Sequence, residues 1–257
     1  MEINPTLPWL ESGEPFPEPT AAWPANSAAP GLLAAGGALD TATLCNAYRQ
    51  GIFPWFSGPQ PRLWWSPDPR MVLRPSAFRL HRSLRKTLLH FQHAANCEIR
   101  FDAAFDQVIS ACAASSRRGQ QGTWIVPEMV QAYQQLHRDG FAHSVETWID
   151  GYLVGGLYCV NLGQAVFGES MFTRQTDASK LALAALVAFA IEKGIDCIDC
   201  QQNTRHLASL GAREIPRSEF SALLKKTTQL RSPDWEFKPL YWSHLLNHQH
   251  TPLVPPR

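Results

Sequence analysis

The 257-residue sequence lacks several patterns that would assign it at once to a functional class. It has no apolar run long enough to cross a membrane. Its acidic, proline-rich N-terminus has neither the basic nor the apolar region of a signal peptide. No glycine-rich phosphate loop and no Gly-x-Ser-x-Gly elbow occurs, so nucleotide-binding and serine-hydrolase classes are disfavoured. The net charge of +1 does not advertise nucleic-acid binding, although a local basic patch is compatible with it.

Metal-ligand patterns are also missing. Of six cysteines, only Cys197 and Cys200 form a Cys-x-x-Cys pair, and a zinc site needs a second pair or suitably spaced histidines. On a strand the two thiols would point to opposite faces. We therefore expect no metal and no other cofactor, and we interpret the cysteines as small buried apolar residues of a reduced, cytoplasmic protein.

The length suits one large domain or two unequal ones, and the periodicity of the second half predicts an α+β fold. Residues up to about Pro30 show no periodicity and are expected to form a loose extension, and 31–37 a turn region. Asp40 is a favourable N-cap for a short helix that Gly51 ends. From residue 71 onward, strands and helices alternate, and 142–172 predicts three antiparallel strands. We expect an N-terminal domain over 1–75 and a larger domain with helices packed on a sheet over 76–257.

The segment GIFPWFSGPQPRLWWSPDPR (51–70) combines five prolines with five aromatic residues. Proline lacks a backbone N–H and restricts the residue before it, so this segment cannot be a helix or a central strand. It could be a rigid wrap over the edge of a core, or a set of surfaces on which a flat ligand stacks. For Trp64 and Trp65 we favour structural roles.

Polar residues occur at two places where burial makes them costly. Glu169 lies inside the apolar strand FGESMF, and Asp199 and Gln201 share one face at the carboxyl end of a buried strand. Buried carboxylates are usually paired or functional, and ligands gather where strands lead into helices. The alternatives are that Asp199 caps a helix beginning near Asn203 and that Glu169 satisfies loop N–H groups.

A basic helix face is predicted over 78–93. Arg82, Arg85 and Lys86 follow one another at helical spacing, with Arg79 one turn earlier and no acid among them. Such a face is either simply solvated or a surface that contacts phosphates.

Several long motifs resemble the bacterial leucyl/phenylalanyl-tRNA–protein transferase family. They are AYRQGIFPWF, LWWSPDPR, GTWI, FGESMF with DASK, and DCQ with HLASLGAREIPR, and the resemblance runs from about residue 31 to about 237. It implies transfer of Leu, Phe or less often Met from aminoacyl-tRNA to the N-terminal Arg or Lys of proteins, which marks them for N-degron proteolysis. It also implies that the larger domain resembles the Gcn5-related N-acetyltransferase fold.

The resemblance also implies roles for individual residues. The polar reaction centre would be Glu169, Asp199 and Gln201. Aromatic residues near the terminal adenosine would be Tyr48, Trp55, Trp124 and Tyr133, since unpaired bases stack on aromatic rings. The pocket for the transferred side chain would be lined by Leu157, Phe167, Leu183, Leu186 and Ile198. The acceptor stem would contact Arg79, Arg82, Arg85 and Lys86. Leu157 and Leu186 replace the more usual Met and Phe, which leaves the preference between Leu and Phe open.

The chemistry would be attack of an α-amine on an ester, which needs mainly positioning and the removal of one proton. We favour Asp199 and Gln201 as groups that orient the amine, with a general-base relay from Asp199 as the alternative. Two other functions fit less well. A CoA-dependent N-acetyltransferase would need a glycine-rich loop where TRQTDASK stands, and a non-catalytic reader of peptide N-termini would leave the basic helix unexplained. We expect a monomer.

Overall fold

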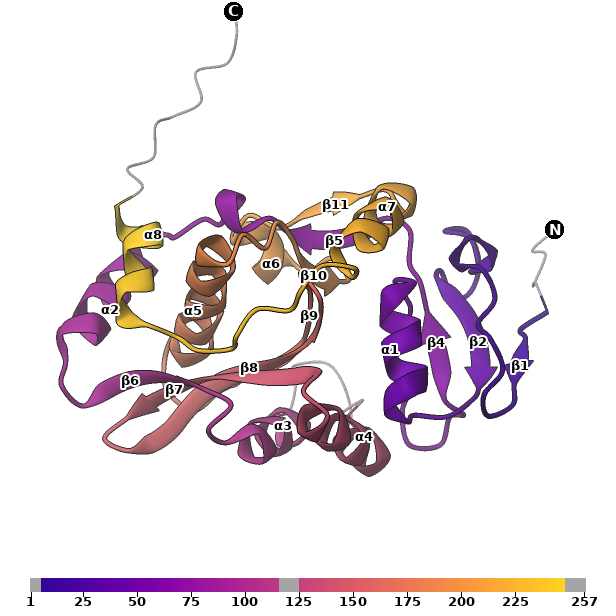
Figure 1. Ribbon diagram of the computed structural model, residues 1–257, viewed down its shortest axis with the longest axis horizontal. Coiled ribbons are helices and arrows are strands. Elements are labelled where there is room, and N and C mark those ends of the chain that lie inside the picture. Colours follow the sequence, from indigo (N-terminus) through magenta and orange to yellow (C-terminus); the bar gives the residue numbers. More distant parts are fainter. Residues whose placement is uncertain (1–5, 116–124, 248–257) are drawn as a thin grey trace, which may run out of the picture.

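The computed structural model of the protein describes residues 6–115 and 125–247 and contains two β-sheets (Figure 1). Helices cover both faces of the larger sheet, and the smaller sheet lies at the N-terminal end of the chain. The α+β class predicted from the sequence is confirmed.

The larger sheet has seven strands. In spatial order they are β11 (Arg213–Ile215), β5 (Arg70–Leu73), β10 (Ile198–Gln201), β9 (Ala165–Thr173), β8 (Tyr152–Leu162), β7 (Ala142–Ile149) and β6 (Cys97–Phe101). All neighbours are antiparallel except β9 and β10, which are parallel. The expected hairpin between β7 and β8 is present, with Asp150 and Gly151 both at positive φ as a two-residue turn of this kind requires.

Strand β8 separates two hydrophobic cores because its side chains alternate between the faces of the sheet. Leu157 and Cys159 contribute to the core under α5, whereas Tyr158 and Val160 contribute to the core under α3 and α4. The helices are α1 (Thr41–Arg49), α2 (Arg82–His93), α3 (Phe105–Ala114), α4 (Pro127–Arg138), α5 (Ala178–Glu192), α6 (Arg205–Ser209), α7 (Arg217–Thr227) and α8 (Ser243–Leu246). Helix α5 is apolar on nearly all sides, and it is covered by the sheet on one side and by α2 and α8 on the other.

The smaller sheet corrects two expectations about the first forty residues. Its order is β1 (Trp9–Leu10), β2 (Leu32–Gly36), β4 (Leu63–Trp65) and β3 (Phe53–Pro54). Residues 31–37 are therefore mostly a fully buried strand and not a turn, and the N-terminal extension pairs with it through β1. The small side chains of β2 allow this close packing, since a Cβ on Gly36 would lie 2.5 Å from the carbonyl oxygen of Leu10.

The aromatic–proline segment forms the β3–β4 hairpin of this sheet. Pro54 lies in the edge strand, where its missing N–H costs least. Trp64 is completely buried and its indole N–H donates to the carbonyl of Gly36 at 2.9 Å, while the Trp65 indole donates to the carbonyl of Trp55 at 2.7 Å. Both tryptophans thus have structural contacts, and the hairpin presents Phe53 and Trp55 toward the larger sheet.

The division of the chain between the two sheets lies earlier than the expected boundary after residue 75. Strand β5 (Arg70–Leu73) pairs with β10 and β11 and so belongs to the larger sheet. We propose a domain boundary near residue 69.

Candidate active site

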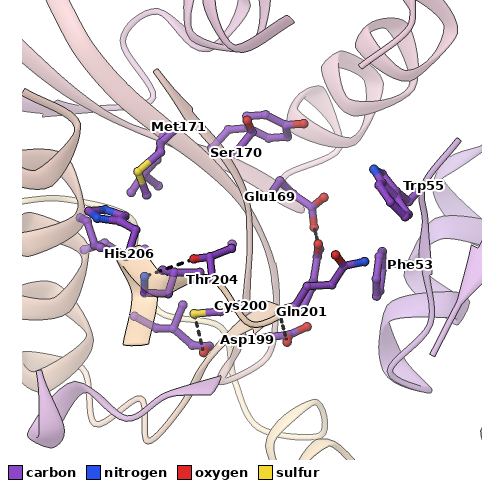
Figure 2. A pocket seen from close by; sticks show the side chains of 18 residues that line it. Phe53, Trp55, Glu169, Ser170, Met171, Asp199, Cys200, Gln201, Thr204 and His206 are labelled. Carbon is purple, nitrogen blue, oxygen red and sulfur yellow. Dashed lines mark hydrogen bonds between the residues drawn. The ribbon is translucent and has the colours of Figure 1, made fainter. Parts of the chain in front are cut away.

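A pocket of about 530 Å³ opens where β9 and β10 diverge (Figure 2). The two parallel strands pair only at Ile198 with Val166 and at Asp199 with Phe167. Beyond these pairs the strands separate, and their facing residues line the pocket. Helices α5 and α6 and the β3–β4 hairpin complete its walls.

Both strands that border the pocket carry a β-bulge at this point. In β9, Gly168 and Ser170 pair with consecutive residues of β8, so Glu169 between them is the extra residue. In β10, Asp199 and Gln201 pair with consecutive residues of β5, so Cys200 is the extra residue. A bulge redirects the side chains around it, and it explains how Glu169 reaches the pocket from an apolar strand.

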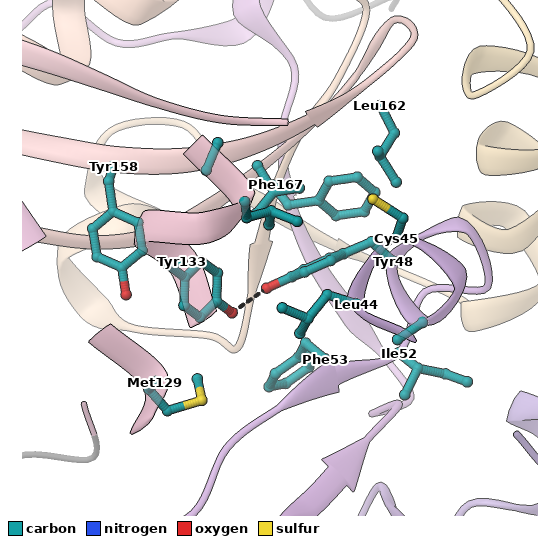
Figure 3. Packing of buried hydrophobic residues seen from close by; sticks show 14 of the residues in the cluster. Leu44, Cys45, Tyr48, Ile52, Phe53, Met129, Tyr133, Tyr158, Leu162 and Phe167 are labelled. Atoms are coloured by element: carbon teal, nitrogen blue, oxygen red, sulfur yellow. Dashed lines mark hydrogen bonds between the residues drawn. The ribbon is translucent and has the colours of Figure 1, made fainter. Parts of the chain in front are cut away.

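Glu169 is buried and surrounded by neutral hydrogen-bond donors. Tyr48 donates its hydroxyl to Oε1 at 2.8 Å, and Gln201 donates Nε2 to the same oxygen at 2.9 Å. The Tyr133 hydroxyl lies 3.2 Å from Oε2 and also forms a hydrogen bond with the Tyr48 hydroxyl (Figure 3). Each hydroxyl carries one proton, so the two tyrosines supply two of these three hydrogen bonds at a time. The donors come from α1, α4 and β10, so three distant segments of the chain meet at this carboxylate.

Burial raises the pKa of Glu169 from 4.5 to about 7. The hydrogen bonds from Tyr48, Gln201 and Tyr133 lower the pKa, and the negative charge of Asp199 raises it further, but loss of hydration is the largest cause. Glu169 is 8% exposed. Burial likewise raises the pKa of both tyrosines well above the ordinary range, so they remain neutral donors.

Asp199 has a different environment, because it forms a buried ion pair with Arg70. The guanidinium donates Nε to Oδ1 at 2.8 Å and Nη2 to Oδ2 at 2.6 Å, and the side chains of Arg70 and Asp199 are 1% and 2% exposed. Arg70 ends the LWWSPDPR motif, but sequence reasoning assigned it no role. Its importance is visible only in the folded structure, where it pairs with Asp199 across the sheet.

Gln201 departs from regular strand geometry. Its φ is +61°, and its backbone N–H donates to Oδ1 of Asp199 at 2.8 Å. The expectation that Asp199 and Gln201 share one face of a regular strand is therefore wrong, since the bulge and the positive φ direct Gln201 toward Glu169 while Asp199 faces Arg70. The alternative that Asp199 caps the following helix is also wrong, because Thr204 caps α6.

The apolar part of the pocket agrees with four of the five predicted residues. Leu157, Leu183, Leu186 and Ile198 line it. Phe167 does not, which corrects the prediction; its ring lies on the other face of the sheet, 4.9 Å from the ring of Tyr48 between centroids. The structure adds four residues from β9, β10 and α6 that the sequence did not suggest: Met171, Cys200, His206 and Leu207.

The predicted adenosine-binding aromatic residues divide into two groups. Trp55 is half-buried and lines the pocket together with Phe53. Tyr48 and Tyr133 have no exposed surface, so stacking of a base on their rings is contradicted, and their contacts assign them to Glu169. Trp124 lies outside the described residues.

Three of the four cations of the predicted basic face, Arg79, Arg82 and Lys86, are exposed. Helix α2 begins at Arg82, so Arg79 precedes the helix, and its backbone N–H donates to the carbonyl of Leu210. Arg82 and Lys86 are exposed, whereas the half-buried Arg85 donates to the carbonyl of Leu246 at 3.0 Å. Arg85 therefore has a structural contact with the end of α8.

Two features are absent from the described residues, 6–115 and 125–247. No group of three or more His, Cys, Asp or Glu side chains in these ranges is placed to hold a metal ion. No helix within them is long and apolar enough to span a membrane.

An apolar pocket that ends at a carboxylate and an amide is the kind of site that a group-transfer enzyme uses to hold an acyl group and remove a proton. Residues 72–225 match the leucyl/phenylalanyl-tRNA protein transferase family, and residues 37–68 match the N-terminal domain of that family. The chain belongs to the leucyl/phenylalanyl-tRNA protein transferase family, and it is an aminoacyltransferase. The resemblance inferred from the sequence motifs is confirmed.

Among its relatives are three leucyl/phenylalanyl-tRNA–protein transferases. The protein from Polaromonas sp. is 63% identical over 93% of this chain and 94% of its own length. The protein from Albidiferax ferrireducens is 60% identical over 94% and 95%, and that from Leptothrix cholodnii is 56% identical over 93% and 95%.

Solved structures of low sequence identity also align with parts of this chain. FemX aligns with a TM-score of 0.42 at 10% identity over 72% of this chain and 71% of its own. A GCN5-related N-acetyltransferase from Kribbella flavida gives 0.31 at 11% identity over 65% and 58%. At TM-scores below 0.5, these alignments carry no argument about the fold or the function of this chain.

Proposed function

We propose that the protein transfers leucine, phenylalanine and, less often, methionine from aminoacyl-tRNA to the N-terminal arginine or lysine of acceptor proteins. The product would enter an N-degron pathway. The apolar pocket that ends at Glu169 and Gln201 is the observation that carries this proposal. Because aminoacyl-tRNA is a cytoplasmic substrate, the proposed reaction is cytoplasmic.

The donor side chain would occupy the apolar end of the pocket. Leu157, Leu186 and Ile198 offer only aliphatic surface there, and Met171 adds a flexible side chain that can adapt to Leu, Met or Phe. One methylene contributes only about 1–3 kcal/mol in such a pocket, so selectivity among these three side chains should be modest.

The terminal adenosine would lie toward the β3–β4 hairpin. Among the predicted adenosine-binding residues that the structure describes, Trp55 is the one that is partly exposed and lines the pocket. Stacking of an unpaired base on such a ring is worth about 1–3 kcal/mol and does not depend on sequence. The exposed cations Arg82 and Lys86 would contact phosphates of the tRNA.

The acceptor needs a second approach to the same centre. A hollow of about 420 Å³ lies on the other side of Gln201, and it shares Trp55, Gln201 and Gln202 with the first pocket. Pro67 and Pro69 form part of its wall, which makes it rigid. An extended N-terminus lying in this hollow would bring its α-amine to Gln201.

The chemical step is aminolysis of the ester that joins the amino acid to the tRNA. The neutral α-amine of the acceptor attacks the ester carbonyl carbon and forms the new C–N bond. The C–O bond to the terminal ribose breaks, the amine nitrogen loses one proton, and the ribose oxygen gains one. Glu169 is the carboxylate best suited to accept the proton, because its pKa of about 7 lies close to neutral pH. Gln201, whose backbone N–H is held by Asp199, would position the amine beside it.

The test is transfer of labelled amino acids by the purified protein. Leu-tRNA and Phe-tRNA would be offered with a peptide that begins with Arg, the same peptide with an acetylated N-terminus, and one that begins with Ala. We expect labelled product only from the free Arg peptide. Equal labelling of the Ala peptide would contradict the acceptor assignment, and absence of transfer from either tRNA would contradict the donor assignment.

A further inference from the structure

Arg70 occupies an unusual position for a cation, because its charge is almost completely shielded from solvent. It is the first residue of β5, the second strand from one edge of the larger sheet, between β11 and β10. Two of its guanidinium nitrogens donate to the two oxygens of Asp199, and Nη1 donates to the carbonyl of Gly51 at 3.0 Å. The rings of Phe53 and Phe220 each lie 4.8 Å from its central carbon.

These contacts join both sides of the candidate active site. Through Asp199, Arg70 reaches the backbone N–H of Gln201, whose side chain donates to Glu169. Through Gly51, it reaches the end of α1, and α1 supplies the Tyr48 hydroxyl that also donates to Glu169. One guanidinium is therefore bonded to both segments that deliver hydrogen bonds to the same carboxylate.

We infer that Arg70 is a positioning residue for aminoacyl transfer, which fixes Asp199 and thereby the strained backbone of Gln201 beside Glu169. The inference rests on the proposed function. Its consequence is that Asp199 acts as a fixed acceptor for the Arg70 fork and the Gln201 N–H, and not as the group that removes the proton. A planar bidentate fork can hold a carboxylate in one orientation, which a single ammonium cannot do.

Three observations favour this role over that of a simple buried ion pair. Oδ1 of Asp199 already accepts from both Arg70 and Gln201, so little of it is open to a substrate amine. The φ of +61° at Gln201 is costly for a residue other than glycine and needs support from its surroundings. Buried ion pairs contribute little net stability, so stability alone is a weak reason for placing one here.

The experiment compares Arg70→Gln, Asp199→Asn and the double variant. Each single change leaves one buried charge without its partner. The double variant replaces the ion pair by two neutral amides that can still form a hydrogen bond with each other, and the amide at position 199 can still accept from the Gln201 N–H. Arg70→Lys keeps the charge and removes the fork. Arg74→Gln is the matched control, because Arg74 directly follows β5, is exposed, and forms an ion pair with the exposed Glu219.

Four quantities are measured for each variant: kcat and KM for Leu transfer, the affinity for a non-reactive aminoacyl-adenosine amide, urea unfolding, and the pH profile of kcat. We expect Arg70→Gln to lower kcat by roughly 100-fold, as a misplaced catalytic group does, with affinity for the amide changed less than threefold. Arg70→Lys should fall between the wild type and Arg70→Gln. Arg74→Gln should resemble the wild type in all four measurements.

The double variant decides the inference. If the pair positions Gln201, the double variant should recover kcat above both single variants and keep the acidic limb of its pH profile. Suppose instead that the double variant is folded and its stability to urea is restored, but its kcat is as low as that of Asp199→Asn. The charge of Asp199 is then needed for the chemistry, and the inference is overturned. Equal loss of kcat and of amide affinity in Arg70→Lys would also overturn it, since that pattern indicates general loss of structure. Transfer by the wild type in the same assay tests the proposed function separately.

Discussion

Replacing Glu169 with glutamine keeps the size of the side chain and removes its ionisation. In the wild type, burial raises the pKa of Glu169 from 4.5 to about 7. Each tenfold change in an ionisation constant corresponds to about 1.36 kcal/mol, so the difference between folded and unfolded chains amounts to about 3 kcal/mol. Because the side chain is 8% exposed, solvent screens little of this free energy.

The sign of the effect follows from the direction of the pKa shift. Folding raises the pKa of this carboxyl, so the folded state is more stable at low pH than at high pH. At low pH the carboxyl is protonated in both the folded and the unfolded chain. This contribution to stability is complete below pH 4.5 and is lost as the pH rises through about 7. Glutamine does not titrate, so Glu169→Gln should gain about 3 kcal/mol relative to the wild type between these pH values.

Urea unfolding of both proteins at several pH values from 4.5 to 8 measures this difference. All other ionisable groups are the same in the two proteins, so their contributions cancel to first order. The constant offset from altered hydrogen bonds with Tyr48, Tyr133 and Gln201 does not affect the pH dependence. If the difference in unfolding free energy is the same at every pH, Glu169 titrates normally and the reasoning is refuted.

The same variant tests catalysis. If Glu169 accepts the proton, Glu169→Gln should lower kcat by roughly 10²–10⁴-fold, and wild-type activity should rise with pH through about 7. The acceptor amine titrates at about 7.7–8.0 and also gives an acidic limb. Two acceptor peptides whose amines differ in pKa separate the contributions. A profile that simply follows the amine, with no fixed limb near 7, would refute the role of Glu169.

Further changes test the walls of the pocket, the basic helix and the tyrosine donors. Leu186→Trp should reduce Phe transfer more than Leu transfer, since it takes volume from the pocket; equal losses in competition assays would count against the pocket. Changing Arg82 and Lys86 together to Ala should weaken tRNA binding and make the slope of log affinity against log salt shallower by up to about 2, while a short aminoacyl-adenosine donor is unaffected; an unchanged slope would indicate a merely solvated face. Tyr48→Phe removes a hydrogen bond that lowers the pKa of Glu169, so the acidic limb should move to higher pH and stability should fall by about 1 kcal/mol; a limb that moves to lower pH would contradict this.

The sequence predicted the larger domain well because its elements obey simple periodicities. The hairpin signal at Asp150 and Gly151 and the apolar length of α5 are local signals that burial reinforces. The smaller sheet was missed for the opposite reason. Strand β2 has little β propensity, and its place is decided by close contact with β1 and β4.

The site was predicted in composition but not in geometry. Glu169, Asp199 and Gln201 stood out because polar residues in apolar strands are costly to bury. The two bulges have no signature in a single sequence, and the one in β10 reverses the expectation drawn from strict alternation at Asp199 and Gln201. The buried pairing of Arg70 with Asp199 joins residues far apart in the chain, so no local pattern could indicate it.

The two buried carboxylates of the site differ in what surrounds them, and this difference accounts for why the site contains both. Asp199 lies against a cation that compensates its charge in a fixed geometry. Within the described part of the chain, the groups that donate hydrogen bonds to Glu169 are neutral, so its charge is stabilised without being cancelled and its proton can leave or return near neutral pH. A carboxylate that must hold a strained backbone benefits from the first environment, and one that must exchange a proton requires the second. Exchanging the environments would lose both functions, since an uncompensated Asp199 could not fix Gln201 and a Glu169 paired with arginine would be too weak a base.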